Sequence, residues 1–298
     1  MNRAGVLEAR RRQDVATLHG IGIPSRMLID GLPGDQLSVL DRAVQYGDGL
    51  FETIRLAAGY PCQWQRHMDR LILGAERLGI EMPDTALLAA EAAEVTWGQH
   101  DGILKLILSR GEGGRGYAPP SPAITRRMLL TYPLAANHGQ QWRDGVTVRY
   151  CQTPVSINPV LAGIKHLNRL DSVLARAEWH DPAIAEGLMF AATGELVGGT
   201  MTNVFVWDGR CLLTPPLDRG GIAGTVRGLT LELAARLGID CLVTRLDRAA
   251  LDQARGLFLT NSIIGVWPVR ELSGRRFDLT HLPWTLLDRL YSAACTAG

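Results

Sequence analysis

Strand-like and helix-like segments follow one another along this chain without a steady strand–helix–strand repeat, and this irregular order most restricts the fold. The segment FETIRL (residues 51–56) has the period-two alternation of a half-buried strand. The segment WQRHMDRLILGAERLGI (residues 64–80) instead places Met68, Leu71 and Ala75 on one helical face. Such a mixture favours an α+β fold, with mixed sheets and flanking helices, over a doubly wound parallel sheet.

The chain length of 298 residues predicts two domains. The segment AANHGQQWRDG (residues 135–145) is polar, contains glycine and has no periodicity, so we expect it to be the interdomain linker. A smaller α/β domain over 27–134 and a larger domain over 146–298 then flank it. Residues 1–26 carry a basic triplet and no secretory core segment, and we expect a loosely ordered extension there.

Charge and cysteine usage exclude several classes of protein. A formal net charge of +1 gives no reason to expect nucleic acid or an anionic membrane as a partner. No apolar run is long enough for a membrane span, and the scattered histidines indicate no metal site. The cysteines are widely spaced and form no C-x-x-C pair, which predicts buried thiols in a reducing, cytoplasmic compartment. They are Cys62, Cys151, Cys211, Cys241 and Cys295.

Lys165 stands out in the segment AGIKHLNRLDSVLARAEW (residues 162–179), where an apolar run gives way to a helical pattern. A lysine at such a junction has two interpretations. It is either a solvated surface charge or an amine held partly desolvated, with a lowered pKa, as a nucleophile or base. The local pattern leaves both open.

Other segments suggest contacts to an anion. RGEGGRG (residues 110–116) has glycines spaced as in a dinucleotide loop, but the proline-rich YAPPSPA that follows cannot continue as a helix. In GGIAGTVRGLTLELAARLG (residues 220–238), Thr225 can cap a helix whose N-terminus would bind an anion. Arg70 on the amphipathic helix would suit a phosphate if it points inward. Each of these features also has an ordinary structural explanation.

Four segments taken in order resemble the fold-type IV pyridoxal-phosphate enzymes, the class of branched-chain and D-amino-acid aminotransferases and 4-amino-4-deoxychorismate lyase. They are LDRAVQYGDGLFET, HMDRLILGAERLGI, LAGIKHLNRLDSVLARAE and LTNSIIGVWPV. The similarity runs from about residue 27 to the end. It implies a two-domain fold like that of D-amino-acid aminotransferase, with a larger domain that binds pyridoxal phosphate, and a homodimer.

The resemblance also implies roles for particular residues. Lys165 would form the Schiff base with pyridoxal 5'-phosphate and act as general base and acid. Arg70 would hold the phosphate, together with the helix start and a late turn. Those further contacts are Gly224, Thr225, Val226, Asn261 and Ser262.

One position departs from the pattern of the family. The family carries a glutamate that pairs with the pyridine nitrogen of the cofactor, five residues before an asparagine. In LVGGTMTNVF (residues 196–205) Gly198 stands in that place, before Asn203. A carboxylate there would deepen the electron sink, so its absence weakens the sink unless Glu186 or Glu195 substitutes for it.

Within the class, SRGEGGRGY, NPVLAGIKHLNRL and TNSIIGVWPV look most like the lyase. The implied reaction converts 4-amino-4-deoxychorismate, supplied by an aminodeoxychorismate synthase, into 4-aminobenzoate and pyruvate. The substrate is dianionic, so we expect Arg110 and Arg115 to bind it, with Tyr46 as a wall of its pocket. The alternatives are a D- or branched-chain amino-acid aminotransferase and a cofactor-binding protein without catalysis.

Overall fold

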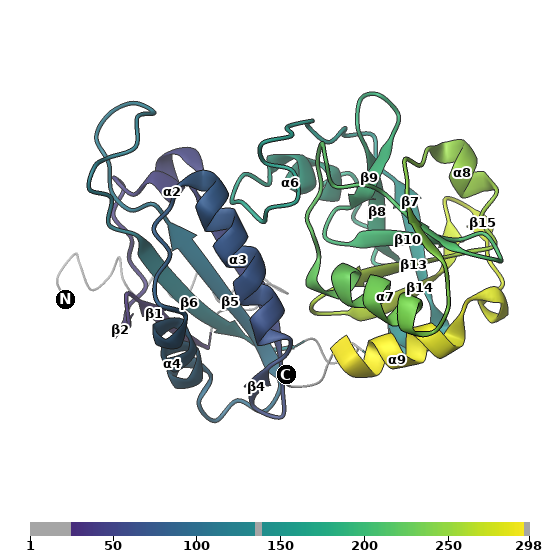
Figure 1. The fold of residues 1–298 in the computed structure, drawn as a ribbon, viewed down its shortest axis with the longest axis horizontal. Coiled ribbons are helices and arrows are strands. Elements are labelled where there is room, and N and C mark those ends of the chain that lie inside the picture. The colour runs from purple at the N-terminus through teal and green to yellow at the C-terminus, as the bar shows by residue number, and fades with distance from the viewer. Residues whose placement is uncertain (1–24, 135–138, 295–298) are drawn as a thin grey trace, which may run out of the picture.

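The computed structural model describes residues 25–134 and 139–294, which form two β-sheets lying side by side (Figure 1). The first sheet has six strands in the order β2-β1-β6-β5-β3-β4, and all neighbours are antiparallel. Its strands are β1 (Arg26–Ile29), β2 (Leu32–Pro33), β3 (Gly49–Ala57), β4 (Tyr60–Pro61), β5 (Gly102–Ser109) and β6 (Arg126–Tyr132).

Two helices cover the first sheet, α3 (Trp64–Leu78) and α4 (Thr85–Thr96), and a short helix α2 (Arg42–Tyr46) precedes β3 (Figure 1). The predicted alternation in β3 is confirmed, because Ile54 and Leu56 are fully buried in the core between sheet and helices. Helix α3 buries Met68 and Leu71 there as expected. It ends at Gly79, whose φ of 62° is a left-handed conformation that glycine adopts without strain.

The second sheet is mixed and has nine strands. Eight follow the order β12-β11-β10-β13-β14-β7-β8-β9, and β15 pairs with β14. Three neighbouring pairs are parallel, namely β11 with β12, β14 with β7, and β7 with β8. The strands are β7 (Val146–Tyr150), β8 (Ile184–Phe190), β9 (Leu196–Gly199), β10 (Asn203–Trp207), β11 (Leu212–Thr214), β12 (Cys241–Val243), β13 (Gly256–Asn261), β14 (Gly265–Leu272) and β15 (Arg275–Arg276).

Both faces of the second sheet are buried, so its central strands are apolar on both sides. In β10, Val204 and Val206 face one core, while Phe205 faces the other and stacks on Phe258 of β13 at 5.0 Å between ring centroids. Each large apolar side chain buried in this way contributes about 1.5–3 kcal/mol. The helices of this half are α5 (Gln140–Asp144), α6 (Leu170–Arg176), α7 (Thr225–Arg236), α8 (Arg248–Asp252), the 3-10 helix η1 (Leu279–His281) and α9 (Trp284–Ala294).

These elements confirm an α+β fold with mixed sheets and flanking helices. The segment expected to be an irregular linker contains α5. Trp142 of this helix packs against the core beneath α7 and α9, and its ring stacks on that of Tyr291 of α9 with 4.6 Å between ring centroids. The division into two domains stays a prediction, although each sheet is built from one side of residues 135–145. The expected extension lies outside the described residues, apart from Ser25 and Arg26, which begins β1.

Side chains of α3 join the two halves of the molecule. Arg66 donates two hydrogen bonds to Glu232 of α7, at 2.7 and 2.6 Å. Gln63, just before α3, donates to the carbonyl of Ala293 in α9 at 2.9 Å, and Arg77 donates to the carbonyl of Ala162. Within residues 25–134 and 139–294, no helix is both long and apolar enough to cross a membrane.

Candidate active site

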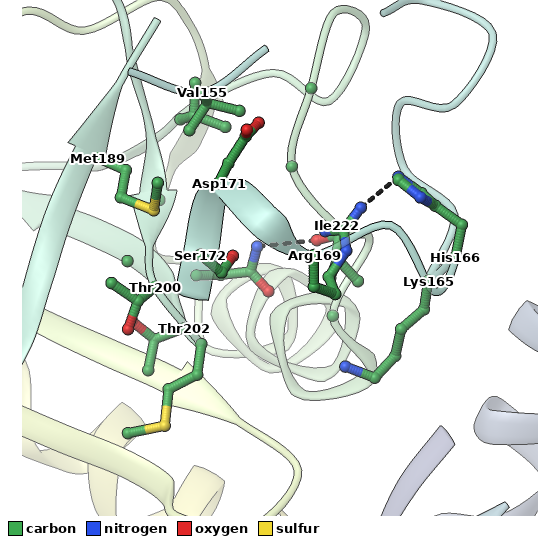
Figure 2. A pocket seen from close by; sticks show the side chains of 18 of the residues that line it. Val155, Lys165, His166, Arg169, Asp171, Ser172, Met189, Thr200, Thr202 and Ile222 are labelled. Carbon is green, nitrogen blue, oxygen red and sulfur yellow. Dashed lines mark hydrogen bonds between the residues drawn. The ribbon is translucent and has the colours of Figure 1, made fainter. Parts of the chain in front are cut away.

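A cavity of about 360 Å³ opens where the two halves meet (Figure 2), a size typical of small-molecule sites. Arg70 of α3 reaches it from the first half, and loops of the second half supply the remaining walls. Those walls include the segment before α6, the β9–β10 turn, the loop before α7 and the turn after β13. The polar residues among them include Lys165, His166, Arg169, Thr200, Thr202, Asn203, Thr225, Asn261 and Ser262.

The backbone around Lys165 is held from both sides. The apolar run before Lys165 forms no strand but a loop with isolated bridges, and the expected helical pattern is realised as α6, which begins at Leu170. On one side, Phe51 of β3 donates to the carbonyl of Lys165 at 3.0 Å. On the other side, Gly163 donates to Gly221 at 3.0 Å and accepts from Ala223 at 2.8 Å. Lys165 is thereby fixed between the first sheet and the loop before α7.

The amine of Lys165 lies in an environment that disfavours its charge. Its Nζ is 4.1 Å from the ring centroid of Phe51, and the side chain is partly buried. Burial lowers the pKa of Lys165, and the positive charge of Arg70 lowers it further, to about 7. A large fraction of this amine is therefore unprotonated at neutral pH. Of the two interpretations from sequence, the structure favours a nucleophile or base.

Arg70 is oriented by a buried carboxylate. Its Nε donates to Glu52 at 2.8 Å, Nη2 also contacts that carboxylate, and Nη1 donates to the carbonyl of Ala223 at 2.9 Å. Burial raises the pKa of Glu52, but the charges of Arg70 and His67 outweigh this and bring it to about 2. Glu52 is therefore ionised and fixes the guanidinium beside the loop that leads into α7.

The N-terminus of α7 presents an anion-binding cradle. Gly224 is the N-cap and provides no side-chain cap, so Thr225 is the first helical residue and not the cap that we expected. The Oγ1 of Thr225 is buried without a hydrogen-bond partner among the described residues. A Cβ on Gly224 would lie 2.0 Å from Oδ1 of Asn203, so only glycine fits here. Free first-turn N–H groups, an unpartnered hydroxyl and the nearby Arg70 suit a phosphate.

The other residues expected to contact the phosphate, Asn261, Ser262 and Val226, differ in which groups they present to the cavity. Asn261 and Ser262 line the cavity. Asn261 is held by accepting from the backbone of Ile263 and Ile264 at 2.8 and 2.9 Å, and Ser262 donates to the carbonyl of Thr53 at 2.6 Å. The side chain of Val226 belongs to the core against α9, so this residue offers only its backbone in the first turn of α7.

The three residues expected to bind the substrate do not line the cavity of this chain. Arg110 donates twice to Asp48, at 2.8 and 3.0 Å, and once each to the carbonyls of Leu78 and Gly79, both at 2.7 Å. Its guanidinium is thus occupied in joining β5 to the end of α3. Arg115 is exposed in the loop after β5, and the Tyr46 ring lies 5.4 Å from that of Tyr117.

Gly198 offers no carboxylate to the cavity. Neither Glu186 nor Glu195, the two carboxylates expected to substitute for one, lines the cavity. Glu186 is fully buried beneath the β9–β10 turn, where Thr200, Met201 and Thr202 donate to it. Glu195 pairs with Arg219 and Arg245. Among the described residues, Asp171 is the one carboxylate that lines the cavity, and it accepts from the backbone of Ser156 at 2.8 Å.

The sequence interpretation missed two cavity residues, His166 and Arg169. Both lie within four positions of Lys165. The sequence also singles out Lys165 by its rarity, because the whole chain has only two lysines, Lys105 and Lys165.

Comparison with known proteins places this geometry in a family. Residues 49–272 match the family described as Amino-transferase class IV, a span that includes Arg70, Lys165, the α7 N-terminus and Asn261. The chain belongs to the class IV aminotransferases. The matched span thus includes every residue that lines the cavity described above.

Named relatives within the family include two lyases. The chain is 33% identical over 249 residues to an aminodeoxychorismate lyase of Vibrio harveyi, covering 82% of this chain and 90% of that one. It is 42% identical to the crystal structure of 4-amino-4-deoxychorismate lyase from Pseudomonas aeruginosa, with a TM-score of 0.85, covering 91% and 100% of the two chains. It is 28% identical to a bifunctional aminodeoxychorismate lyase and D-amino acid transaminase of Mycobacterium tuberculosis, over 89% and 93%.

Proposed function

We propose that this protein converts 4-amino-4-deoxychorismate into 4-aminobenzoate and pyruvate with pyridoxal 5'-phosphate as cofactor. The observation that carries the proposal is the placement of Lys165, whose amine packs on Phe51 and whose pKa is lowered to about 7, in one cavity with an anion cradle. Similarity to two lyases over most of the chain supports the same assignment. The product would be a precursor for folate synthesis.

The residues present fit pyridoxal phosphate. Arg70, the first turn of α7 and the hydroxyl of Thr225 would hold the phosphate, and Lys165 would carry the aldehyde end. When bound, this cofactor supplies an electrophilic carbon for the substrate amine and a sink for electrons.

Lys165 would move the proton in the reaction. Its amine takes the proton from the ring carbon that bears the amino group of the substrate. The ring then becomes aromatic as the bond from the neighbouring carbon to the enolpyruvyl oxygen breaks. The same proton, returned from Lys165, converts the released enolpyruvate into pyruvate. A pKa near 7 suits both the acceptance and the return of this proton.

Gly198 favours the lyase over a transaminase. A transaminase must hold a full carbanion, which a carboxylate at this position would stabilise. In the elimination the electrons leave with the enolpyruvyl group, and the developing aromatic ring drives the step. A weaker electron sink therefore costs the lyase less.

A coupled assay tests the proposal. Purified protein loaded with pyridoxal phosphate is mixed with an aminodeoxychorismate synthase, chorismate and glutamine, and 4-aminobenzoate and pyruvate are followed. We expect equal release of both products, and loss of both in Lys165→Ala and Lys165→Arg. The arginine variant keeps the positive charge but lacks a reactive amine. Absence of product from the wild-type protein would overturn the proposal.

An aminotransferase is the second candidate, because one relative combines lyase and D-amino acid transaminase activities. It predicts that D-alanine or glutamate converts the bound cofactor to its amine form, followed by release of the keto acid. Measurement of both reactions on one preparation separates the two candidates. We also expect a homodimer in the cytoplasm that receives its substrate from the synthase.

A further inference from the structure

Arg169 is the arginine of the cavity whose guanidinium has no anionic or carbonyl partner in the part of the chain that the structure describes. It lies at the N-cap of α6 and lines the same cavity as Lys165 and Arg70. Within the described residues, its one side-chain hydrogen bond goes to Nε2 of His166 (Figure 2), and its Nε is buried without a partner. Arg70, by contrast, uses its donors on Glu52 and Ala223.

His166 does not neutralise this charge. An arginine only donates, so Nε2 of His166 accepts and Nδ1 carries the ring hydrogen. Burial lowers the pKa of His166, and the charge of Arg169 lowers it further, to about 4, so the ring is neutral at pH 7. The side chain is only 9% exposed, and its Nδ1 also lacks a partner in the described structure.

Asp171 does not neutralise the charge by a direct bond either. Its carboxylate raises the pKa of Arg169 at a distance, against the larger lowering caused by burial. Its Oδ2 is taken by the backbone of Ser156. A partly buried guanidinium with unused donors carries a cost that a bound anion would remove.

We propose that Arg169, supported by His166, binds an anionic oxygen of the molecule that fills the cavity, and that this oxygen belongs to a carboxylate of the dianionic substrate. The inference deepens the proposed function and rests on it for the identity of the substrate. A guanidinium fork matches a carboxylate with two parallel hydrogen bonds. The other source of such an oxygen is the cofactor itself.

Binding measurements on the cofactor-loaded protein distinguish the two sources. Chorismate is the probe, because it has both carboxylates but a hydroxyl where the substrate has its amine, and so it binds without turnover. The variants are Arg169→Gln and Arg169→Lys, with Arg176→Gln as a control. Arg176 lies on the same helix, donates to the carbonyl of Trp179 at 2.9 Å and does not line the cavity.

If the substrate is the source, Arg169→Gln raises the Kd of chorismate by roughly 10-fold to 100-fold, as loss of a charged hydrogen bond does. The Kd and visible absorption of the cofactor then stay unchanged. Arg169→Lys retains part of the affinity, and Arg176→Gln behaves as wild type. If the cofactor is the source, its absorption or Kd changes in Arg169→Gln before any probe is added.

If the Kd of chorismate and the Kd of the cofactor both change by less than about twofold in Arg169→Gln, the proposed role of Arg169 is overturned, whatever the coupled assay gives. The proposed function fails separately, when the wild-type protein forms no product. If the wild-type protein does not bind chorismate, the assignment of the oxygen to the substrate is overturned, and a cofactor signal that changes in Arg169→Gln assigns the oxygen to the cofactor instead. A melting curve for each variant excludes unfolding, and Arg169→Lys keeps the test decisive if Arg169→Gln does not fold.

Discussion

At the scale of single residues, Lys165 combines a fixed backbone with an amine whose charge is disfavoured. We expect reductive methylation of the apoprotein to modify it with a midpoint near pH 7, since that is its pKa, against an ordinary value of 10.5. Mass spectrometry of the Lys165 peptide over a pH series gives the midpoint. Arg70→Gln should move the midpoint upward, because a neighbouring positive charge is removed. A midpoint above about 9 in the wild-type protein would contradict the assignment.

Gly198 gives a second prediction at this scale. Gly198→Glu should raise the ratio of transaminase to lyase activity, because it supplies the missing carboxylate. A Cβ at this position would lie 2.9 Å from the carbonyl of Thr202, so the turn must shift to admit it. Gly198→Ala makes the same steric demand without the charge and is therefore the matched control. An equal or lower ratio in Gly198→Glu than in Gly198→Ala would count against this role of the carboxylate.

At the scale of elements, the start of α7 depends on one glycine. Gly224→Ala should weaken pyridoxal phosphate binding by about tenfold or more, because its Cβ would collide with Asn203 beside the cradle. Gly228→Ala on the same helix is the control. Its Cβ would meet only Arg66 Nη1, at 3.8 Å, and alanine stabilises a helix interior by about 0.5–1 kcal/mol. Titration of both variants with the cofactor tests this, and equal affinities would exclude the cradle.

Strand β3 and helix α3 are joined by the buried Glu52, which contacts both Arg70 and His67. Glu52→Gln should destabilise the protein by about 3–5 kcal/mol at pH 7, as breaking a buried ion pair does. The carboxyl has a pKa of about 2 in the folded state and an ordinary value of 4.5. Its stabilisation is therefore present above pH 4.5 and is lost as the pH falls toward 2. Urea unfolding at several pH values should show the two proteins converging in acid.

At the scale of the whole molecule, a helix beside the cavity leaves apolar side chains in solvent. Leu170, Val173 and Leu174 of α6 are 74%, 59% and 59% exposed, and contiguous apolar surface of this kind marks interaction sites. We expect light scattering to give the mass of two copies, and the double variant Val173→Asp, Leu174→Asp to shift the protein toward one copy. A single-copy mass for the wild type would contradict the expected homodimer.

The fold was largely readable from local patterns, and the site only in part. Strand β3 and helix α3 follow from periodicities within a few residues, and Lys165 and Arg70 came from short motifs. Arg110 was misplaced because its partner Asp48 is 62 positions away, and nothing local reveals that contact. The segment expected to be a linker forms helix α5, and its Trp142 stacks on Tyr291, a residue far along the chain. Long-range pairing decides such cases, and a single sequence does not display it.

The pairing of both lysines with one ring has a practical consequence. Nζ of Lys105 lies 5.5 Å from the ring centroid of Phe51, on which Lys165 also packs, so every lysine of this chain borders the same aromatic side chain. Amine-directed reagents, which usually decorate a protein surface at many places, would meet here only the chain terminus and the surroundings of Phe51. At Lys165 a fluorescent aldehyde or activated ester would thus report whether the site is occupied, with Lys105, which does not line the cavity, as the internal reference.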